Sequence, residues 1–292
     1  MPEGKIVKAL AGFYYVLADD GSITQCRGRG VFRKNKITPL VGDIVKFQAE
    51  NAQEGYVLEV LDRKNELTRP PIANIDQAIL VFSAVEPDFS TALLDRFLTL
   101  IESKHITPVI CITKMDLLTD DRKVKEYASY YENIGYTVLM TSNKDPEGVA
   151  TIYPYLADKV SVIAGQSGVG KSSLLNVLRP DLDLKTDEIS MHLGRGKHTT
   201  RHVELIEVEK GYVADTPGFS SLEFLELEVE DVKDCFLEFV RLSEGCKFRG
   251  CTHLKEPKCA VKEAVENGEI ALYRYEHYMN FVEEITNRKP RY

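Results

Sequence analysis

The chain has 292 residues, 43% of them hydrophobic and 28% charged, with a formal net charge of −8. This composition is ordinary for a soluble globular protein and excludes a disordered or fibrous chain, and the length predicts about two domains of about 150 residues each. The negative charge excludes a protein that coats nucleic acid over its whole surface. The sequence has no apolar run of about 18 residues, which predicts no membrane span. The small number of cysteines and an N-terminus unlike a signal peptide predict a cytoplasmic location.

Residues 1–68 are expected to form a small β-barrel. Short apolar runs between residues 3 and 67 alternate with turn residues, and Gly21, Gly28 and Gly42 mark breaks between them. Several short strands in so short a segment are typical of an OB-fold-like barrel, which binds oligonucleotides. A different small barrel fits the pattern nearly as well.

The same N-terminal segment carries the candidate residues for RNA contact. It has a positive balance, 11 Lys and Arg against 9 Asp and Glu over residues 1–70. No acidic residue occurs between Ser22 and Val41, and this stretch contains Arg27, Arg29, Arg33, Lys34 and Lys36. With Phe32 among them, these residues suit contact with an RNA backbone combined with base stacking, and a solvated loop is the alternative. A second basic group farther along the chain consists of Lys247, Arg249, Lys255 and Lys258.

After a linker predicted at Arg69-Pro70-Pro71, the pattern changes to alternating strands and helices. We expect an α/β domain over residues 69–222, because fully apolar runs are typical of parallel strands covered on both faces. The expected strands are 77–84, 107–113, 136–140 and 159–165, and the expected helices lie near 91–103, 119–134, 147–157 and 171–178. Residues 223–292 are predicted to form a helical, acidic C-terminal domain.

A phosphate-binding loop is predicted between the strand at 159–165 and the helix at 171–178. Residues 165–172 read GQSGVGKS and match the pattern G-x-x-x-x-G-K-[ST] in the strand–loop–helix context that it requires. Glycines let backbone N–H groups face the phosphates, and the helix N-terminus adds a partial positive charge. The side chain of Lys171 would bridge the β- and γ-phosphates, and the hydroxyl of Ser172 would bind Mg²⁺. The predicted contacts are Gly165, Gln166, Ser167, Gly168, Val169, Gly170, Lys171, Ser172 and Ser173.

Thr113-Lys114-Met115-Asp116 resembles the N-K-x-D motif with which GTPases read the base. A carboxylate at Asp116 offers two acceptors to the N1–H and 2-amino groups of guanine, whereas adenine would leave it unpaired. Lys114 would lie along the base. Thr113 stands where Asn is usual, so the sequence leaves open how firmly this loop is tied to the phosphate loop. Thr141-Ser142 follows the next strand, where GTPases place a loop whose N–H meets guanine O6.

Asp215-Thr216-Pro217-Gly218 matches the D-x-x-G motif at the end of an apolar strand. Asp215 would hold Mg²⁺ through water, and the N–H of Gly218 would sense the γ-phosphate. The Gly-rich basic segment 192–201 looks like a switch loop that supplies a threonine ligand to Mg²⁺; Thr200 is the first choice and Thr199 the second.

The catalytic residues predicted for GTP hydrolysis are Lys171, Thr200 and His198. Phe219 follows the D-x-x-G motif at the position where a glutamine orients the attacking water in Ras-like enzymes, so slow intrinsic hydrolysis is expected. His198 is the candidate for positioning that water, because an imidazole can orient or deprotonate water near neutral pH. A solvated loop histidine or a nucleic-acid contact is an equal alternative for it.

The motifs occur in the order base, base, phosphate loop, switch, switch, whereas an ordinary GTPase begins with the phosphate loop. One site can be built from either order, because each motif lies at a strand end on the same side of the sheet. The sequence therefore predicts a circularly permuted GTPase domain.

A metal site is predicted near the C-terminus from Cys246, Cys251, His253 and Cys259. Three thiols and an imidazole in so short a loop form a Cys3His set that suits tetrahedral zinc, and nothing indicates an open catalytic position, so the zinc is expected to be structural. Cys26, Cys111 and Cys235 stand alone in apolar stretches and are expected to be packed thiols.

Together these features resemble the bacterial GTPases that depend on the small ribosomal subunit, which are circularly permuted GTPases of subunit assembly. The resemblance rests on GQSGVGKSS at 165–173, GKHTT at 196–200, DTPGF at 215–219 and the Cys3His set, and it covers essentially the whole chain. It implies an N-terminal OB-fold-like barrel, a central permuted GTPase domain and a C-terminal zinc-binding domain. The nucleotide site that it implies consists of Asp116, Lys171, Ser172, Thr200 and Asp215, with His198 as a catalytic candidate.

The resemblance also implies a function. Such a protein binds the 30S subunit and its rRNA, hydrolyses GTP to GDP and phosphate with stimulation by the subunit, and assists late 30S maturation. The implied cofactors are Mg²⁺ with GTP and one structural Zn²⁺, and nothing in the sequence calls for more than a monomer. The alternatives are a GTPase of large-subunit assembly or tRNA modification, and a passive RNA-binding module.

Overall fold

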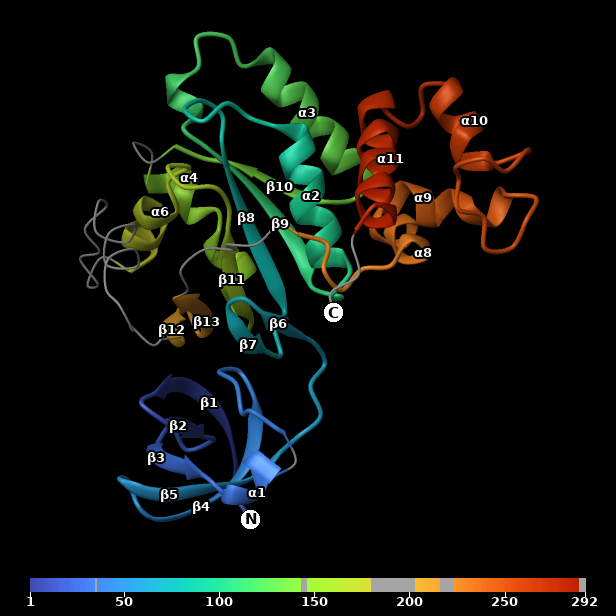
Figure 1. Ribbon diagram of the computed structural model, residues 1–292. Coiled ribbons are helices and arrows are strands. Elements are labelled where there is room, and N and C mark those ends of the chain that lie inside the picture. Colours follow the sequence, from blue (N-terminus) through green and yellow to red (C-terminus); the bar gives the residue numbers. More distant parts are fainter. Residues whose placement is uncertain (35, 143–145, 180–202, 216–222, 289–292) are drawn as a thin grey trace.

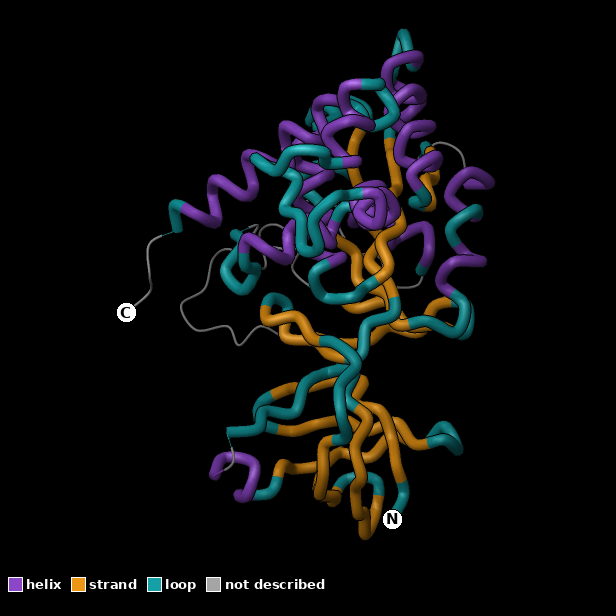
Figure 2. The backbone as a smooth tube through the Cα atoms, turned by 90° about the vertical axis from the view of Figure 1, so that its right-hand side faces the viewer, coloured by secondary structure: helices purple, strands orange, loops and turns teal. Residues whose placement is uncertain are grey.

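The computed structural model describes residues 1–34, 36–142, 146–179, 203–215 and 223–288 (Figure 1). The chain forms three parts: a β-barrel, a central α/β part, and a group of helices beside it (Figures 1 and 2). No helix among the described residues is long and apolar enough to cross a membrane.

The N-terminal barrel is a closed sheet of five strands. These are β1 (Glu3–Leu10), β2 (Phe13–Ala18), β3 (Ile23–Gly28), β4 (Ile44–Asn51) and β5 (Glu54–Val60), with the short helix α1 (Gly30–Lys34) after β3. The strands neighbour one another in the order β1-β2-β3-β5-β4, and β4 pairs back to β1. Only the β3–β5 pair is parallel, which is the connectivity of an OB fold and confirms the predicted barrel.

The alternation of buried and exposed residues explains why these strands close. Ile6, Val16, Cys26, Val45 and Val57 come from five different strands, and each is completely buried in the barrel core. Their other sequence neighbours are less buried, as the two-residue period of a strand requires, and the exception is Val7, which enters the core where the register of β1 shifts.

The segment between the barrel and the α/β part is a structured joint. Strands β6 (Glu66–Thr68) and β7 (Pro71–Ala73) pair antiparallel, so the predicted linker at Arg69-Pro70-Pro71 includes the turn of a small hairpin. The guanidinium of Arg63 binds both carboxylate oxygens of the buried Asp43, with N–O distances of 2.7 and 2.8 Å. Gly42 has φ +91°, and a Cβ there would lie 2.0 Å from the carbonyl oxygen of Ala73, so only glycine fits where the barrel meets this hairpin.

The central sheet has the order β10-β9-β8-β11-β13-β12. Its strands are β8 (Gln77–Ser83), β9 (Thr107–Thr113), β10 (Thr137–Met140), β11 (Val160–Ala164), β12 (Val203–Val208) and β13 (Gly211–Asp215). All neighbours are parallel except β12 and β13. The four strands expected from the apolar runs are present with bounds that differ by at most a few residues.

Helices cover both faces of this sheet, which is why every residue of β8 and β11 is buried. One face packs against α2 (Thr91–Glu102) and α3 (Arg122–Ile134). The other face packs against α4 (Pro146–Ala150), α5 (Tyr153–Leu156) and α6 (Lys171–Leu178). The short 3-10 helix η1 (Met115–Leu117) follows β9.

The barrel and the central sheet form one continuous sheet of eleven strands. The first residues of β1 pair with β4 and close the barrel, whereas Lys8 and Ala9 pair with Glu204 and Val203 of β12. An ion pair of 2.9 Å between the Lys8 ammonium and the Glu204 carboxylate reinforces the contact.

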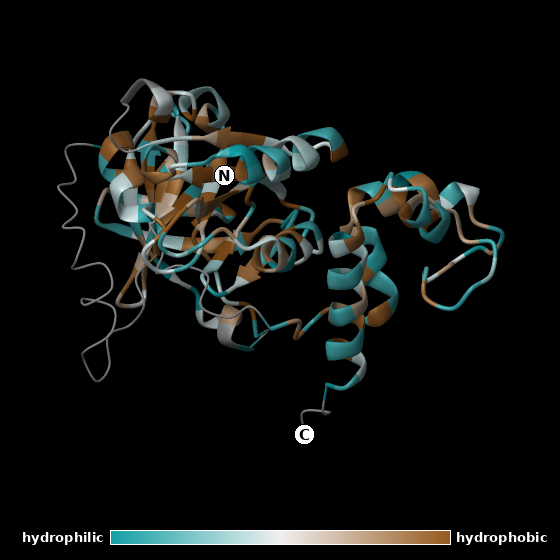
Figure 3. Ribbon diagram, turned by 90° about the horizontal axis from the view of Figure 1, so that it is seen from above, coloured by the Kyte–Doolittle hydropathy of each residue, from teal (hydrophilic) through white to brown (hydrophobic). Residues whose placement is uncertain are grey.

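The C-terminal helices form a lobe to one side of the α/β part (Figure 3). They are α8 (Val229–Val232), η3 (Lys233–Cys235), α9 (Leu237–Leu242), η4 (Ser243–Gly245), α10 (Ala260–Glu266) and α11 (Leu272–Thr286). Phe236, Phe239 and Tyr278 are completely buried at the centre of the lobe.

A buried ionic network fixes this lobe to the α/β part. Arg274 of α11 lies 2.6 Å from the Asp95 carboxylate of α2 and 2.7 Å from the Glu238 carboxylate of α9. Asp95 also accepts a 2.5 Å hydrogen bond from the hydroxyl of Tyr131 in α3 and lies 2.5 Å from the His277 imidazole. Because removal of one partner would leave an unpaired charge in the interior, the network holds four helices in one arrangement.

Candidate nucleotide site and metal centre

The predicted nucleotide-binding motifs follow strands that end at the same edge of the central sheet. The register pairs Ala164 of β11 with Leu80 of β8, Ser83 of β8 with Thr113 of β9, and Ile112 of β9 with Met140 of β10. These strands are parallel, so the phosphate loop, the Thr113–Asp116 loop and the Thr141-Ser142 loop leave the sheet side by side. Such a switch-point edge is where α/β sheets bind ligands.

The phosphate loop has the backbone geometry that its glycines predict. Gly165 has φ +149°, and a Cβ there would lie 2.1 Å from the carbonyl oxygen of Val81, so no residue with a side chain fits at this position. Gly168 and Gly170 have φ +82° and +99°, and Gly170 directly precedes α6. The loop therefore turns its backbone toward the N-terminus of α6, where an anion is stabilised.

The Lys171 side chain folds back over this loop. Its ammonium donates a 2.9 Å hydrogen bond to the carbonyl of Gly165 and another hydrogen bond to the carbonyl of Gln166. Burial lowers the pKa of Lys171, because the charged form loses water. The carbonyl groups of Gly165 and Gln166 are neutral and do not balance the positive charge of the ammonium. Phosphate oxygens would supply the negative charge that balances it. Ser172 and Ser173 are partly exposed in the first turn of α6.

The hydroxyl of Thr113 ties the base loop to the phosphate loop. It donates to the carbonyl of Val169 at 2.6 Å and lies 3.2 Å from the carbonyl of Phe82 in β8. Thr113 is completely buried. A threonine at this position thus makes the link that the sequence left open.

Asp116 is oriented by the second base loop. The Ser142 hydroxyl donates to the Asp116 carboxylate at 2.6 Å, and the backbone N–H of Met115 donates to the Thr141 carbonyl at 3.3 Å. Lys114 adopts a left-handed backbone with φ +59°, and its ammonium donates to the carbonyl of Glu86. The two loops therefore present a fixed carboxylate beside the phosphate loop.

Replacing Thr113 with valine is expected to weaken binding of GDP and GTP by about tenfold. The substitution keeps the shape but removes the donor to the Val169 carbonyl, and an unsatisfied buried carbonyl costs about 1–3 kcal/mol. Titration of a fluorescent GDP analogue measures the loss. Thr113→Ser keeps the donor and should bind like the parent. Equal affinity of the valine variant and the parent would contradict the role of this hydroxyl.

The remaining predicted residues of the nucleotide site lie at or beyond the limits of the described structure. Asp215 is the last residue of β13, at the same edge of the sheet as the phosphate loop. His198, Thr199 and Thr200 fall outside the described residues, as do Gly218 and Phe219.

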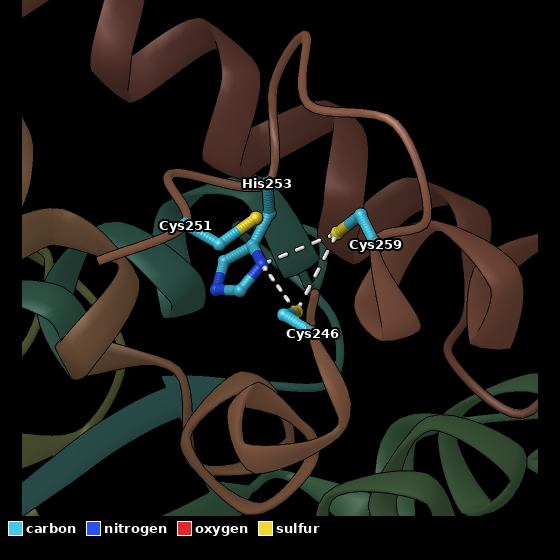
Figure 4. A group of neighbouring side chains, drawn as sticks. All are labelled: Cys246, Cys251, His253 and Cys259. Atoms are coloured by element: carbon cyan, nitrogen blue, oxygen red, sulfur yellow. Dashed lines mark hydrogen bonds between the residues drawn. The ribbon is translucent and has the colours of Figure 1, made fainter. Parts of the chain in front are cut away.

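The Cys3His set comes together as predicted (Figure 4). The four candidate ligand atoms of Cys246, Cys251, His253 and Cys259 all lie within 4.8 Å of one another. The Nδ1 atom of His253 is 3.3 Å from the sulfur of Cys259 and 3.7 Å from that of Cys246, and those two sulfurs are 3.9 Å apart. Tetrahedral zinc with N and S ligands needs separations of about 3.5–3.8 Å. The residues present therefore fit a metal ion.

The surroundings of the cluster support the same conclusion. The Ser243 hydroxyl donates to the carbonyl of Phe239 at 2.7 Å and lies 3.2 Å from Nε2 of His253, so it accepts the Nε2 proton and leaves the Nδ1 lone pair for a metal. Glu256 organises the loop: partial burial would raise its pKa, but hydrogen bonds from Thr252 and from backbone N–H groups lower the pKa to about 2. Cys26, Cys111 and Cys235 are buried outside the cluster.

The basic residues predicted for RNA contact lie on the barrel. Arg27, Arg29, Lys34 and Lys36 are exposed, and Arg33 belongs to α1. The expectation that Phe32 stacks on bases is wrong, because Phe32 is 5% exposed and packs into the barrel core.

Sequence reasoning missed two aromatic residues on the outside of the barrel. Phe13 is paired with Arg27 across β2 and β3, and Tyr56 is paired with Arg27 across β3 and β5. The signal that could have found them is the two-residue period of strands. Because Val16 of β2 and Val57 of β5 are buried, Phe13 and Tyr56 lie on the opposite, outer face of the same strands.

The central sheet has the strand order β12-β13-β11-β8-β9-β10. Along the chain, the base loops after β9 and β10 precede the phosphate loop after β11. This arrangement defines a circularly permuted P-loop GTPase. The sequence models of the RsgA GTPase and of the RsgA N-terminal domain match residues 60–225 and 3–57. The chain belongs to the RsgA GTPase family. This confirms the predicted fold class and resemblance.

Individual relatives match over the full length. The chain is 69% identical to a protein of Bacillus cytotoxicus and 63% identical to one of Bacillus subtilis, each called small ribosomal subunit biogenesis GTPase RsgA, over 100% of both chains. The crystal structure of YloQ, described as a circularly permuted GTPase, superposes with a TM-score of 0.87 at 58% identity and covers 100% of this chain and 97% of that chain. YjeQ from Thermotoga maritima gives 0.87 at 40% identity, with 99% of each chain covered.

Proposed function

We propose that this chain hydrolyses GTP to GDP and phosphate, binds the small ribosomal subunit, and assists its late maturation in the cytoplasm as a monomer. The observation that carries the proposal is the convergence of a phosphate loop and an oriented base-reading carboxylate at one edge of one sheet. The names of the full-length relatives supply the ribosomal part.

In the proposed site, the backbone of residues 165–170 holds the phosphates and Lys171 bridges the β- and γ-phosphates. Asp116 reads the N1–H and 2-amino groups of guanine, while Ser142 keeps its carboxylate in place and the backbone after β10 meets O6. Ser172 and Thr200 would bind Mg²⁺ directly and Asp215 through water. Mg²⁺ would neutralise charge on the β- and γ-phosphate oxygens.

The proposed catalytic water is positioned by His198, and the N–H of Gly218 senses the γ-phosphate. Phe219 cannot orient water, so turnover in the absence of a partner is slow. The subunit then accelerates hydrolysis by contributing to the positioning of this water.

The proposed division of labour follows the three parts of the chain. Residues 1–68 contact rRNA through Arg27, Arg29, Arg33, Lys34 and Lys36, and residues 69–222 bind and hydrolyse GTP. Residues 223–292 hold one structural zinc through Cys246, Cys251, His253 and Cys259, which fixes the loop that they close.

The proposal is tested by measuring GTP hydrolysis alone, with purified 30S subunits and with purified 50S subunits, at two salt concentrations. We expect strong stimulation by 30S subunits only, and weaker stimulation at the higher salt concentration, because contacts with rRNA phosphates release counterions. Stimulation by 50S subunits instead would indicate the large-subunit alternative. Absence of turnover with either subunit, together with nucleotide-independent RNA binding, would indicate a passive RNA-binding module.

A further inference from the structure

An aromatic–cation–aromatic stripe crosses three adjacent strands on the outer face of the barrel. The register places Phe13 of β2 opposite Arg27 of β3, and Arg27 opposite Tyr56 of β5. The neighbouring residues on the inner face are Cys26 and Gly55, which are buried, and Tyr14, which is half-buried and packs against the core. The side chains of the stripe therefore all point away from the core.

Arg27 and Tyr56 of this stripe are exposed, whereas Phe13 is half-buried and lies against the Arg27 guanidinium. The Arg27 guanidinium lies 5.0 Å from the centre of the Phe13 ring, and the Tyr56 side chain is 55% exposed. The barrel core is complete without these residues, since its strands contribute Val16, Cys26 and Val57 inward. The exposure of Arg27 and Tyr56 consequently has no explanation in the stability of the barrel.

We propose that Phe13, Arg27 and Tyr56 form a stacking platform for unpaired RNA bases. The inference rests on the proposed binding of rRNA and specifies which form of RNA the barrel takes. Aromatic rings and a planar guanidinium offer faces on which bases stack whatever their sequence. A duplex buries its base faces and does not offer them.

Charge around the stripe fits a nucleic-acid strand that runs across it. Arg29, Lys34 and Lys36 follow Arg27 along the chain and are exposed, so they can contact phosphates on one side of the platform. Glu54, two residues before Tyr56, is the nearest carboxylate along β5, and the Asn51 amide donates to it at 3.4 Å. The platform itself carries one positive charge, so stacking rather than phosphate contact dominates there.

The test uses the full chain and two probes of equal length, a fluorescent oligouridine and an RNA duplex. The double variant Phe13→Ala with Tyr56→Ala is expected to bind oligouridine at least about tenfold more weakly, because each stacked base contributes about that factor. Duplex binding should stay unchanged, and so should the salt dependence of oligouridine binding, because no phosphate contact is lost.

Control variants separate stacking from folding and from general hydrophobicity. Tyr56→Phe keeps the ring and should bind oligouridine like the parent. Ile23→Ala removes an exposed apolar side chain from the same strand as Arg27 and should have no effect. The double variant Phe13→Leu with Tyr56→Leu keeps apolar side chains without rings, so it should lose binding like the alanine variant. Basal GTP hydrolysis should stay at the parental rate in all variants.

Unchanged oligouridine affinity in both double variants, or an equal loss for the duplex, would overturn the inference. Loss of 30S-stimulated hydrolysis in the double variants with oligouridine affinity unchanged would point to a protein partner on this face, and would also overturn it. These outcomes differ from failure of the proposed function, in which the parent protein itself shows no stimulation by the small subunit.

Discussion

Asp116→Asn is expected to change the nucleotide preference from guanine to xanthine. In the parent, both N1–H and the 2-amino group of guanine can donate to the carboxylate, which the Ser142 hydroxyl holds at 2.6 Å. The introduced amide can still accept from Ser142 through its oxygen, while its NH₂ group can donate to the 2-oxo group of xanthine and opposes the 2-amino group of guanine. Because the bound base would shield this side chain from water, a mismatch leaves a polar group unpaired, and the guanine-over-xanthine ratio should fall by a factor on the order of 10⁴.

Competition between GDP and XDP for the same site measures this ratio. Asp120→Asn is the matched control, because Asp120 is exposed like Asp116 and lies in the same loop region, but among the contacts described it pairs with Arg122 instead of Ser142. It should leave the ratio unchanged. If Asp116→Asn also left the ratio unchanged, the base would not be read at this carboxylate.

Removal of the proposed zinc is expected to unfold the loop 246–259 and to loosen the core of the C-terminal lobe. Cys251 and Cys259 are both part of that core. Burial raises the pKa of the Cys251 thiol to about 12, so without a metal this thiol is protonated at neutral pH and no bond to an ion holds it in place. Structural zinc contributes about 10–16 kcal/mol of apparent binding free energy to such sites. Cys259→Ser should therefore lose stoichiometric zinc and the lobe's cooperative unfolding transition.

Metal analysis, limited proteolysis and calorimetry follow these changes. Zinc binding displaces protons from the thiols, so zinc affinity should fall as the pH falls. Affinity for GDP should remain close to parental, because the phosphate loop and base loops belong to other elements. Cys235→Ala is the control, since Cys235 is buried in the same lobe but lies outside the cluster. A parent protein that purifies without any bound metal would contradict the assignment.

The parts of the site that could be predicted from the sequence are those in which neighbouring residues carry the chemistry. The phosphate loop and the Cys3His set are contiguous, and each required only its own segment to fold. The common location of the phosphate loop and the two base loops follows from one further rule, that parallel strands end at the same edge of a sheet. The permuted order of motifs did not disturb that rule.

Contacts between distant segments could not be predicted. The hydroxyl of Thr113 meets the Val169 carbonyl across 56 positions, and nothing in either local sequence indicates it. The network of Arg274, Asp95 and Glu238 joins three helices whose relative positions only the folded chain defines. The basic neighbours of Phe32 favour a surface position that suits base stacking, but packing in the barrel decides its burial.

The pairing of β1 with β12 covers one edge strand of the GTPase sheet. Without its barrel, the GTPase sheet would have two bare borders, and backbone groups on a bare border can recruit strands from other molecules. β1 occupies one of them through Lys8 and Ala9. The other is β10, which has only four residues, and strands that short resist such recruitment. The barrel thus covers a border of the GTPase sheet that would otherwise be open to the addition of another strand.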